Sequence, residues 1–348
     1  MEIALEYEFG KFLECDNEGI SFILGGDSAV KWKLYRGLKR FATGKMLSEL
    51  EEHVYGDDGI VIRADGRQIK AKDIQLLMID HRESFFEQLR VSKGTMMNGF
   101  VETLQDNFEV IKKMDELNDD LLRLEILIQE KFSDSFTTVV PLIKNFTFND
   151  LMKNFLGLSY YEENKEFPLE MMDVATVIDD YCDILEHNLS STSKETWLWL
   201  FNPNSFVNNV VLQQLLERLK VICSESDLLR VFVLSDDCLG ISHAEEDIAK
   251  TVLVYQNQQQ QLPELSELIK SIERYYPDDF RYDTEQLVDS LYRIFPSVGQ
   301  EDAKIYLKPK DMLLLKVVSQ LVDCPSKEKC KDFSDELTTL EKKFLQKE

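Results

Sequence analysis

The chain has 348 residues and a formal net charge of −24, and 44% of its residues are hydrophobic. Such a length usually divides into two or three domains with buried interiors. No apolar run is long enough to span a bilayer and the first residues lack a secretory pattern, so we expect a cytoplasmic protein without membrane partners. The acidic charge argues against nucleic acid as a partner, unless cations gather at one place.

The cysteines and histidines form no metal or redox pattern. Six cysteines occur without a CxxC pair, and the four histidines are equally dispersed. Scattered cysteines in an intracellular chain are typically reduced thiols, so we expect neither a zinc site nor a disulfide framework.

Short apolar runs predict buried strands. They lie at residues 20–24, 74–79, 196–201, 229–234 and 251–255. Helical patterns separate these runs, and this alternation is typical of an α/β fold with a mostly parallel sheet covered on both faces. A shorter pair, at 60–63 and 68–70, is joined through Asp65-Gly66 and predicts a hairpin.

A helical insertion follows the second of these strands. Apolar residues repeat at helical spacing from Met97 to Ile128 and again from Met171 to Leu189. Two amphipathic helices that run out and back would form an arm. Packing explains the apolar stripes, and we expect part of them to contact another subunit.

A polar segment follows the last strand. Residues 256–261 read Gln-Asn-Gln-Gln-Gln-Gln before Leu262-Pro263, a composition that is typical of a linker. We therefore predict three parts: an α/β head at 1–82 plus 193–257, a helical arm at 83–192, and a helical C-terminal appendix at 262–348.

A strand, a glycine turn and a helix follow one another at residues 22–28. Nucleotide-binding loops share this order, but they need a lysine and a hydroxyl at the helix start for phosphate and magnesium. No GKS or GKT sequence occurs in the chain, and Asp27 would repel phosphate. We therefore interpret Gly25-Gly26 as a degenerate P-loop and expect no bound nucleotide.

No catalytic pattern is evident, so we predict that the protein is not an enzyme. GxSxG, HExxH and GxGxxG are absent, as is any arrangement of a nucleophile beside a base. Asp80, Asp236 and Asp237 follow buried strands, but acids at such positions are usually solvated loop residues.

One predicted helix carries a concentration of positive charge. The window 31–45 holds cations and no acid, and we call its cations the basic stripe: Lys31, Lys33, Arg36, Lys39, Arg40 and Lys45. Val30, Leu34 and Leu38 fall on one side of the helix, and several cations fall opposite. Outer helix faces usually mix both signs, so the basic stripe predicts contacts to DNA phosphates without reading of bases.

Three stretches resemble the DNA-end-binding adaptation protein of type II-A CRISPR systems. They are the Gly25-Gly26 turn with the hairpin and residues 72–80, residues 147–158, and residues 196–203 continuing through Leu215 to 230–234. The resemblance covers roughly residues 1–257, and the segment after residue 262 indicates the longer variety of the family.

The resemblance implies a P-loop-like fold that has lost its nucleotide site, and a ring-shaped homotetramer. Such rings bind double-stranded DNA ends in a basic hole during spacer acquisition, as part of antiviral defence with other CRISPR adaptation proteins. Calcium accompanies some rings as a structural ion. Some relatives are rich in acids where this chain has residues 137–144, so we assign no calcium ligands.

Three hypotheses therefore stand. The first is sequence-independent binding of double-stranded DNA ends by a ring-shaped oligomer. The second is a P-loop-like nucleotide-dependent enzyme, which the missing lysine and hydroxyl oppose. The third is a protein–protein scaffold built on the arm, in which the basic stripe is merely solvated.

Overall fold

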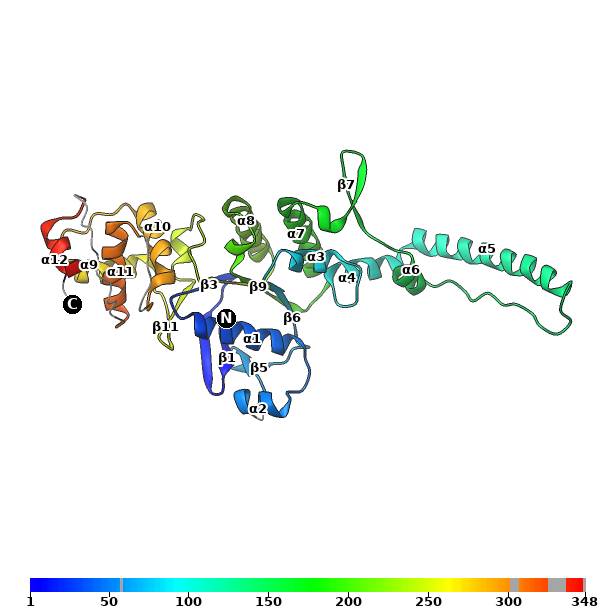
Figure 1. The fold of residues 1–348 in the computed structure, drawn as a ribbon, viewed down its shortest axis with the longest axis horizontal. Helices are drawn as coiled ribbons and strands as arrows, with labels where there is room; N and C mark the ends of the chain where they lie inside the picture. The colour runs from blue at the N-terminus through cyan, green and yellow to red at the C-terminus, as the bar shows by residue number, and fades with distance from the viewer. Residues whose placement is uncertain (57–58, 301–306, 325–335, 347–348) are drawn as a thin grey trace. The chain divides into compact units, whose positions relative to one another are not determined.

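The structure, a computed structural model, describes residues 1–56, 59–300, 307–324 and 336–346 (Figure 1). It contains two compact units, which we call the head unit (Met1–Ser84 with Thr192–Glu348) and the arm unit (Phe85–Ser191). Residues 262–348, which we predicted to form a separate appendix, therefore group with the head. No helix in the described ranges is long and apolar enough to cross a membrane.

The head unit is built on a six-stranded sheet with the order β12-β11-β3-β10-β9-β6. Its parallel strands are β3 (Ile20–Leu24), β6 (Ile74–Ile79), β9 (Glu195–Phe201), β10 (Leu229–Leu234) and β11 (Thr251–Tyr255). Every residue of β3 and β11 is buried, as expected of strands that are covered on both faces. The prediction of an α/β fold with a mostly parallel sheet is confirmed.

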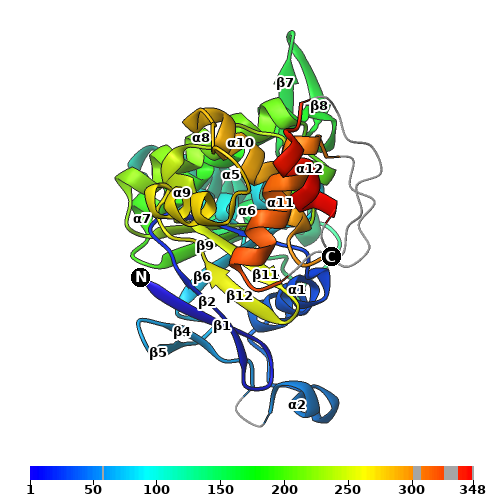
Figure 2. The same ribbon diagram turned by 90° about the vertical axis from the view of Figure 1, so that its left-hand side faces the viewer.

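The segment predicted to be a linker is instead an edge strand. β12 (Gln258–Gln261) pairs antiparallel with β11, and the turn between them places Gln256 and Asn257 at positive φ. The side chains of Gln259 and Gln261 accept hydrogen bonds from backbone N–H groups of β2 (Lys11–Asp16), which lies beside β12 in Figure 2. The linker prediction is wrong because these polar side chains join two sheets.

A second, antiparallel sheet has the order β2-β1-β4-β5. Its remaining strands are β1 (Glu2–Glu8), β4 (Ile62–Ala64) and β5 (Arg67–Ile69). The last two form the predicted hairpin. The helix α1 (Ser28–Ala42) buries Val30, Leu34 and Leu38 in a core that includes side chains from both sheets, so its apolar face fixes the direction of its polar face.

The other helices of the head are α2 (Glu49–Tyr55), α8 (Asn209–Glu225), α9 (Leu265–Tyr275), α10 (Thr284–Ile294), α11 (Pro309–Leu321) and α12 (Thr339–Gln346). The C-terminal helices contact the six-stranded sheet directly. The Tyr292 hydroxyl of α10 lies 2.8 Å from the Thr251 hydroxyl, and the Tyr292 ring stacks on His243. These buried contacts explain why residues 262–348 group with the head.

The arm unit contains α4 (Met96–Thr103), α5 (Phe108–Ser133), α6 (Phe148–Asn154), α7 (Val174–Ser191) and the hairpin of β7 (Ser159–Glu162) with β8 (Lys165–Pro168). The helix α3 (Glu83–Leu89) begins in the head and enters this unit. Figure 1 shows α5 as one long helix, and the chain returns along it without regular secondary structure. Asn118 and Glu125 hold the returning segment by hydrogen bonds to Phe146 and Ile143.

The helix predicted over residues 171–189 is present, but the segment that returns along α5 is a different one, without regular secondary structure. The apolar stripe from Met171 to Leu189 falls largely on α7, which packs against α4 and buries Tyr181, Cys182 and Leu185. The apolar residues of this stripe therefore belong to a core within the arm unit. By contrast, α5 has no buried residue along its 26 positions.

Candidate nucleic-acid interface

The glycine turn before α1 already uses its hydrogen-bond donors. The backbone N–H of Gly26 donates to the Val298 carbonyl at 2.7 Å, and that of Asp27 donates to the Val254 carbonyl at 3.1 Å. The Asp27 carboxylate caps α1 by accepting from the Val30 N–H at 3.0 Å. Phosphate loops need unoccupied N–H groups at such a turn, and these two groups have protein partners.

Lys31 lies inside the head unit, with a side chain that is 1% exposed. Its ammonium donates to the carbonyls of Gly25 and Ser235 at 2.8 Å and pairs with Asp236 at 2.7 Å. Burial lowers the pKa of Lys31, and the nearby carboxylate of Asp236 only partly opposes this. The structure corrects the prediction for Lys31, because an ammonium with three internal partners cannot reach DNA.

Three further cations of the basic stripe have acidic partners that are distant in sequence. The ion pairs are Lys33–Glu8, Lys39–Asp80 and Arg40–Glu51, with N–O distances of 2.5, 2.5 and 2.6 Å. The sequence window contains no acid, but its surroundings in the fold do. A phosphate must therefore compete with a carboxylate for each of these cations.

Asp80 is a structural anchor and not the solvated loop acid that we predicted. Besides Lys39, it accepts hydrogen bonds from the hydroxyls of Tyr35 and Ser84. Burial acts to raise the pKa of Asp80, but the hydrogen bonds from Lys39, Tyr35 and others outweigh it and hold that pKa well below its usual range. Asp236 is also internally bonded, to Lys31, so its predicted solvation is wrong as well.

Ser84, His81 and Asp80 lie together but do not form a catalytic relay. The Ser84 hydroxyl is 2.9 Å from His81 Nδ1, and the Asp80 carboxylate contacts that same nitrogen. A nucleophile–base–acid relay needs one partner on each ring nitrogen of the histidine. This cluster therefore fixes a side-chain arrangement and offers no activated nucleophile.

Two cations of the basic stripe remain available to contact phosphates. Arg36 and Lys45 are exposed, and neither side chain has an ion pair within the part of the chain that the structure describes. Lys45 lines a hollow of about 450 Å³ together with Lys70, which follows β5. Lys72 is also exposed nearby in sequence, and we call Arg36, Lys45, Lys70 and Lys72 the open cations.

Sequence reasoning missed Lys70 and Lys72, because acids at Asp65 and Asp73 interrupt that window. In the fold, both carboxylates accept backbone hydrogen bonds, from Glu2 and Lys70 respectively. The signal that could have found the two lysines is their position just after a hairpin, where turn acids often bond to the backbone.

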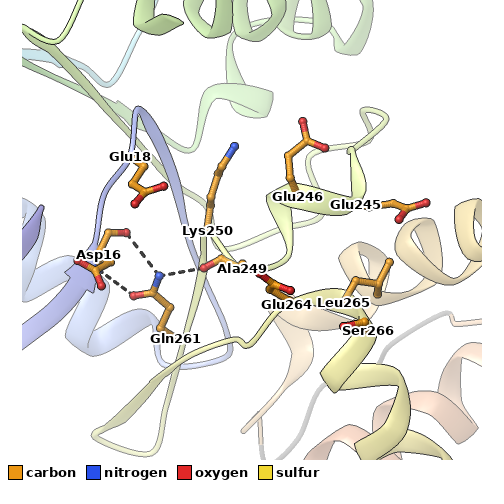
Figure 3. A pocket seen from close by; sticks show the side chains of 10 residues that line it. All are labelled: Asp16, Glu18, Glu245, Glu246, Ala249, Lys250, Gln261, Glu264, Leu265 and Ser266. Atoms are coloured by element: carbon orange, nitrogen blue, oxygen red, sulfur yellow. Dashed lines mark hydrogen bonds between the residues drawn. The ribbon is translucent and has the colours of Figure 1, made fainter.

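An acidic pocket of the head unit lies at the amino ends of the parallel strands. Its volume is about 500 Å³, and Figure 3 shows its carboxylates beside Lys250. The acids that line it are Asp16, Glu18, Glu245, Glu246 and Glu264. Such a region repels DNA, so the head presents unlike charges at different places on its surface.

The described ranges contain no group of three or more His, Cys, Asp or Glu side chains that could hold a metal ion. Calcium usually takes several carboxylate or carbonyl oxygens. No such cluster in these ranges marks a calcium site, and the calcium ion that the resemblance implied stays a prediction.

Comparison with solved structures identifies the fold. The crystal structure of Stu0660 of Streptococcus thermophilus matches with a TM-score of 0.84 and 18% identity, covering 99% of this chain and 100% of that chain. A SmcHead bound to the C-winged helix domain of ScpA gives a TM-score of 0.42 at 9% identity, covering 77% of this chain and 98% of that chain. The second value is too low to indicate a shared fold.

Comparison by sequence identifies the family. No curated protein sequence matches the chain. The family model described as CRISPR-associated protein Csn2 subfamily St matches residues 6–346. The chain therefore belongs to the Csn2 subfamily St of CRISPR-associated proteins, which confirms the resemblance to the adaptation protein of type II-A systems.

Proposed function

We propose that the protein binds double-stranded DNA ends, independently of sequence and without catalysis, as a ring-shaped homotetramer. Membership in the Csn2 family implies a role in CRISPR adaptation, and so in antiviral defence beside other CRISPR proteins. The observation that carries the DNA proposal is the set of open cations, which stay exposed on a chain of net charge −24.

The open cations suit the phosphate backbone. Lysine and arginine side chains that contact phosphates give affinity without base specificity, and this affinity falls steeply with salt. Arg36 and Lys45 are therefore the principal contacts from the basic stripe. Lys33, Lys39 and Arg40 contribute less, because each must first leave a carboxylate.

The arm unit supports the oligomer. Large apolar side chains are exposed along α5, among them Phe108, Leu122 and Leu127. Within the described residues, such a long helix with no buried residue leaves apolar side chains uncovered, although the returning segment bonds to part of it. A second copy of the chain would cover them, and four copies would bring several sets of open cations around one duplex.

The turn at Gly25-Gly26 supports a P-loop ancestry with the nucleotide site lost. The turn keeps the order of strand, glycines and helix, but Val298 occupies the Gly26 donor and Lys31 is bonded internally. These contacts oppose the alternative of a nucleotide-dependent enzyme. We propose that no nucleotide takes part in DNA binding.

The test compares linear duplex DNA with a covalently closed circle of the same sequence. Sedimentation would give the mass of the protein and of each complex at several salt concentrations. We expect a tetramer that binds the linear duplex, with little binding to the circle, since a closed circle cannot enter a ring. A monomer that binds both forms equally would overturn the proposal.

A further inference from the structure

A second pocket of the head unit lies at the carboxyl ends of the parallel strands, beside the polar face of α1. Its volume is about 480 Å³, and its lining comes from α1 and from the ends of β6, β9 and β10. In open α/β sheets, ligands usually bind at the carboxyl ends of the strands. None of the open cations lines this pocket.

Trp32 is the unusual residue of this pocket. Of the three tryptophans of the chain, Trp197 and Trp199 are 0% exposed in the core, whereas Trp32 is 60% exposed. Its ring stacks on Tyr35, with ring centroids 5.2 Å apart and an interplanar angle of 30°. Tyr35 is held in turn by an edge contact with Phe201 at 4.7 Å. The Trp32 ring therefore has a fixed support on one side and solvent on the rest.

The charged side chains of the pocket neutralise one another. Lys31 pairs with Asp236, and Lys39 pairs with Asp80. A ligand that depends on several phosphates finds few unpaired cations here, whereas a flat neutral ring meets an aromatic surface. Lys39 and His81 are half-exposed at the lining and offer polar atoms to the edge of such a ring.

We propose that this pocket binds a nucleobase, stacked on the exposed part of Trp32. Aromatic side chains beside cations bind unpaired bases in this way, with little dependence on base identity. Trp32 lies one helical turn before Arg36 on α1, so a strand whose phosphates contact Arg36 could place its terminal base on Trp32. An unpaired base at a DNA end and a free nucleoside present the same ring to the pocket. That the base comes from a DNA end rests on the proposed function.

The position of the tryptophans gives a direct assay. Because Trp197 and Trp199 are buried, quenching of intrinsic fluorescence by acrylamide reports mainly on Trp32. The probes are adenosine, a duplex with short 3′ overhangs, and the same duplex closed by hairpins. We expect adenosine and the overhang duplex to shield Trp32 from acrylamide, and the hairpin-closed duplex to leave it accessible.

Two variants complete the experiment. Trp32→Leu should weaken binding of the overhang duplex about tenfold, whereas Trp32→Phe should keep most of the affinity because it retains an aromatic face. Trp32 is largely exposed, so both variants should melt like the parent. The hairpin-closed duplex should bind the parent and Trp32→Leu equally.

The outcomes separate this proposal from the proposed function. If no duplex binds the parent but adenosine shields Trp32, the nucleobase pocket stands and DNA binding fails. If duplexes bind but neither adenosine nor the overhang shields Trp32, DNA binding stands and the nucleobase pocket is overturned. A Trp32→Leu variant that changes the mass of the oligomer but leaves base binding unchanged would also overturn the nucleobase pocket. In that case Trp32 would contact another copy of the chain.

Discussion

The ammonium of Lys31 lies 2.7 Å from the carboxylate of Asp236, at the carboxyl ends of β3 and β10 in the interior of the head unit. In a working nucleotide site, this region would hold phosphate and a metal ion. Here a side chain of the protein supplies the positive charge and two carbonyls complete its coordination by hydrogen bonds. Lys31 is therefore part of the architecture that supports α1.

Replacing Lys31 tests this structural role. Lys31→Met removes the ammonium and leaves Asp236 and two carbonyls without their donor, so we expect the free energy of unfolding to fall by about 3 kcal/mol. Urea denaturation measures this change. The double variant Lys31→Met with Asp236→Asn should regain part of the stability, because it removes the unpaired carboxylate. A single variant as stable as the parent would contradict the role.

Releasing a paired cation should strengthen DNA binding. The hydrogen bond from Lys33 is the largest influence that lowers the pKa of Glu8, to about 2. Glu8→Gln would free Lys33 for phosphate, so we expect tighter binding and a log–log salt slope that is steeper by about 0.9 for each added contact. Fluorescence anisotropy with a labelled duplex measures both.

Glu264→Gln is the matched control for Glu8→Gln. It makes the same change of charge in the acidic pocket, far in sequence from α1. We expect it to leave the salt slope unchanged. Equal effects from both variants would indicate that only the overall field changed and that Lys33 gains no phosphate contact.

The arm should control assembly. Leu122→Glu with Leu127→Glu places charges on exposed apolar positions of α5, so we expect a smaller particle in solution with an unchanged melting temperature. Val221→Glu on α8 is the control, because it adds a charge at an exposed apolar position of the head. A double variant that keeps the mass of the parent would exclude this face of α5 from the interface.

The contact between the C-terminal helices and the sheet predicts a pH dependence. His243 is buried against Tyr292, and burial lowers its pKa from 6.5 to about 4, although Asp247 acts in the opposite direction and Lys220 adds to the lowering. Between these two values the unfolded chain binds more protons than the folded chain. Stability should therefore fall as the pH drops from about 6.5 to about 4, by about 3 kcal/mol in total.

Urea denaturation across this pH range measures the effect of His243. The variant His243→Phe keeps an aromatic ring but cannot take up a proton, so its stability should depend less on pH within this window. Identical slopes for the parent and His243→Phe would show that His243 does not carry the dependence.

The sequence was sufficient to predict the parallel sheet, because strands that are buried on both faces are apolar along most of their length, as at residues 229–234. It could not reveal β12, since the glutamines of that strand make contacts that depend on distant residues such as Glu14. The prediction that the whole basic stripe contacts phosphates was wrong in part for the same reason. The acids that pair with these cations, Glu8, Glu51 and Asp80, approach them only after folding. The burial of Lys31 likewise depends on Ser235 and Asp236, which follow β10.

The central claim is that the open cations bind the phosphates of duplex DNA. Charge reversal at Arg36 of α1 and at Lys45, which follows α1, tests it most directly. The measurement is the anisotropy of a labelled linear duplex with Arg36→Glu plus Lys45→Glu, over a salt series. Arg281→Glu plus Lys343→Glu is the control, because it makes the same charge change at exposed positions of the C-terminal part of the head. We predict that the first variant keeps the mass of the parent, loses at least about tenfold in affinity and has a shallower salt slope, while the control binds nearly as the parent does. Equal binding by the parent and the first variant, at every salt concentration, would contradict the claim.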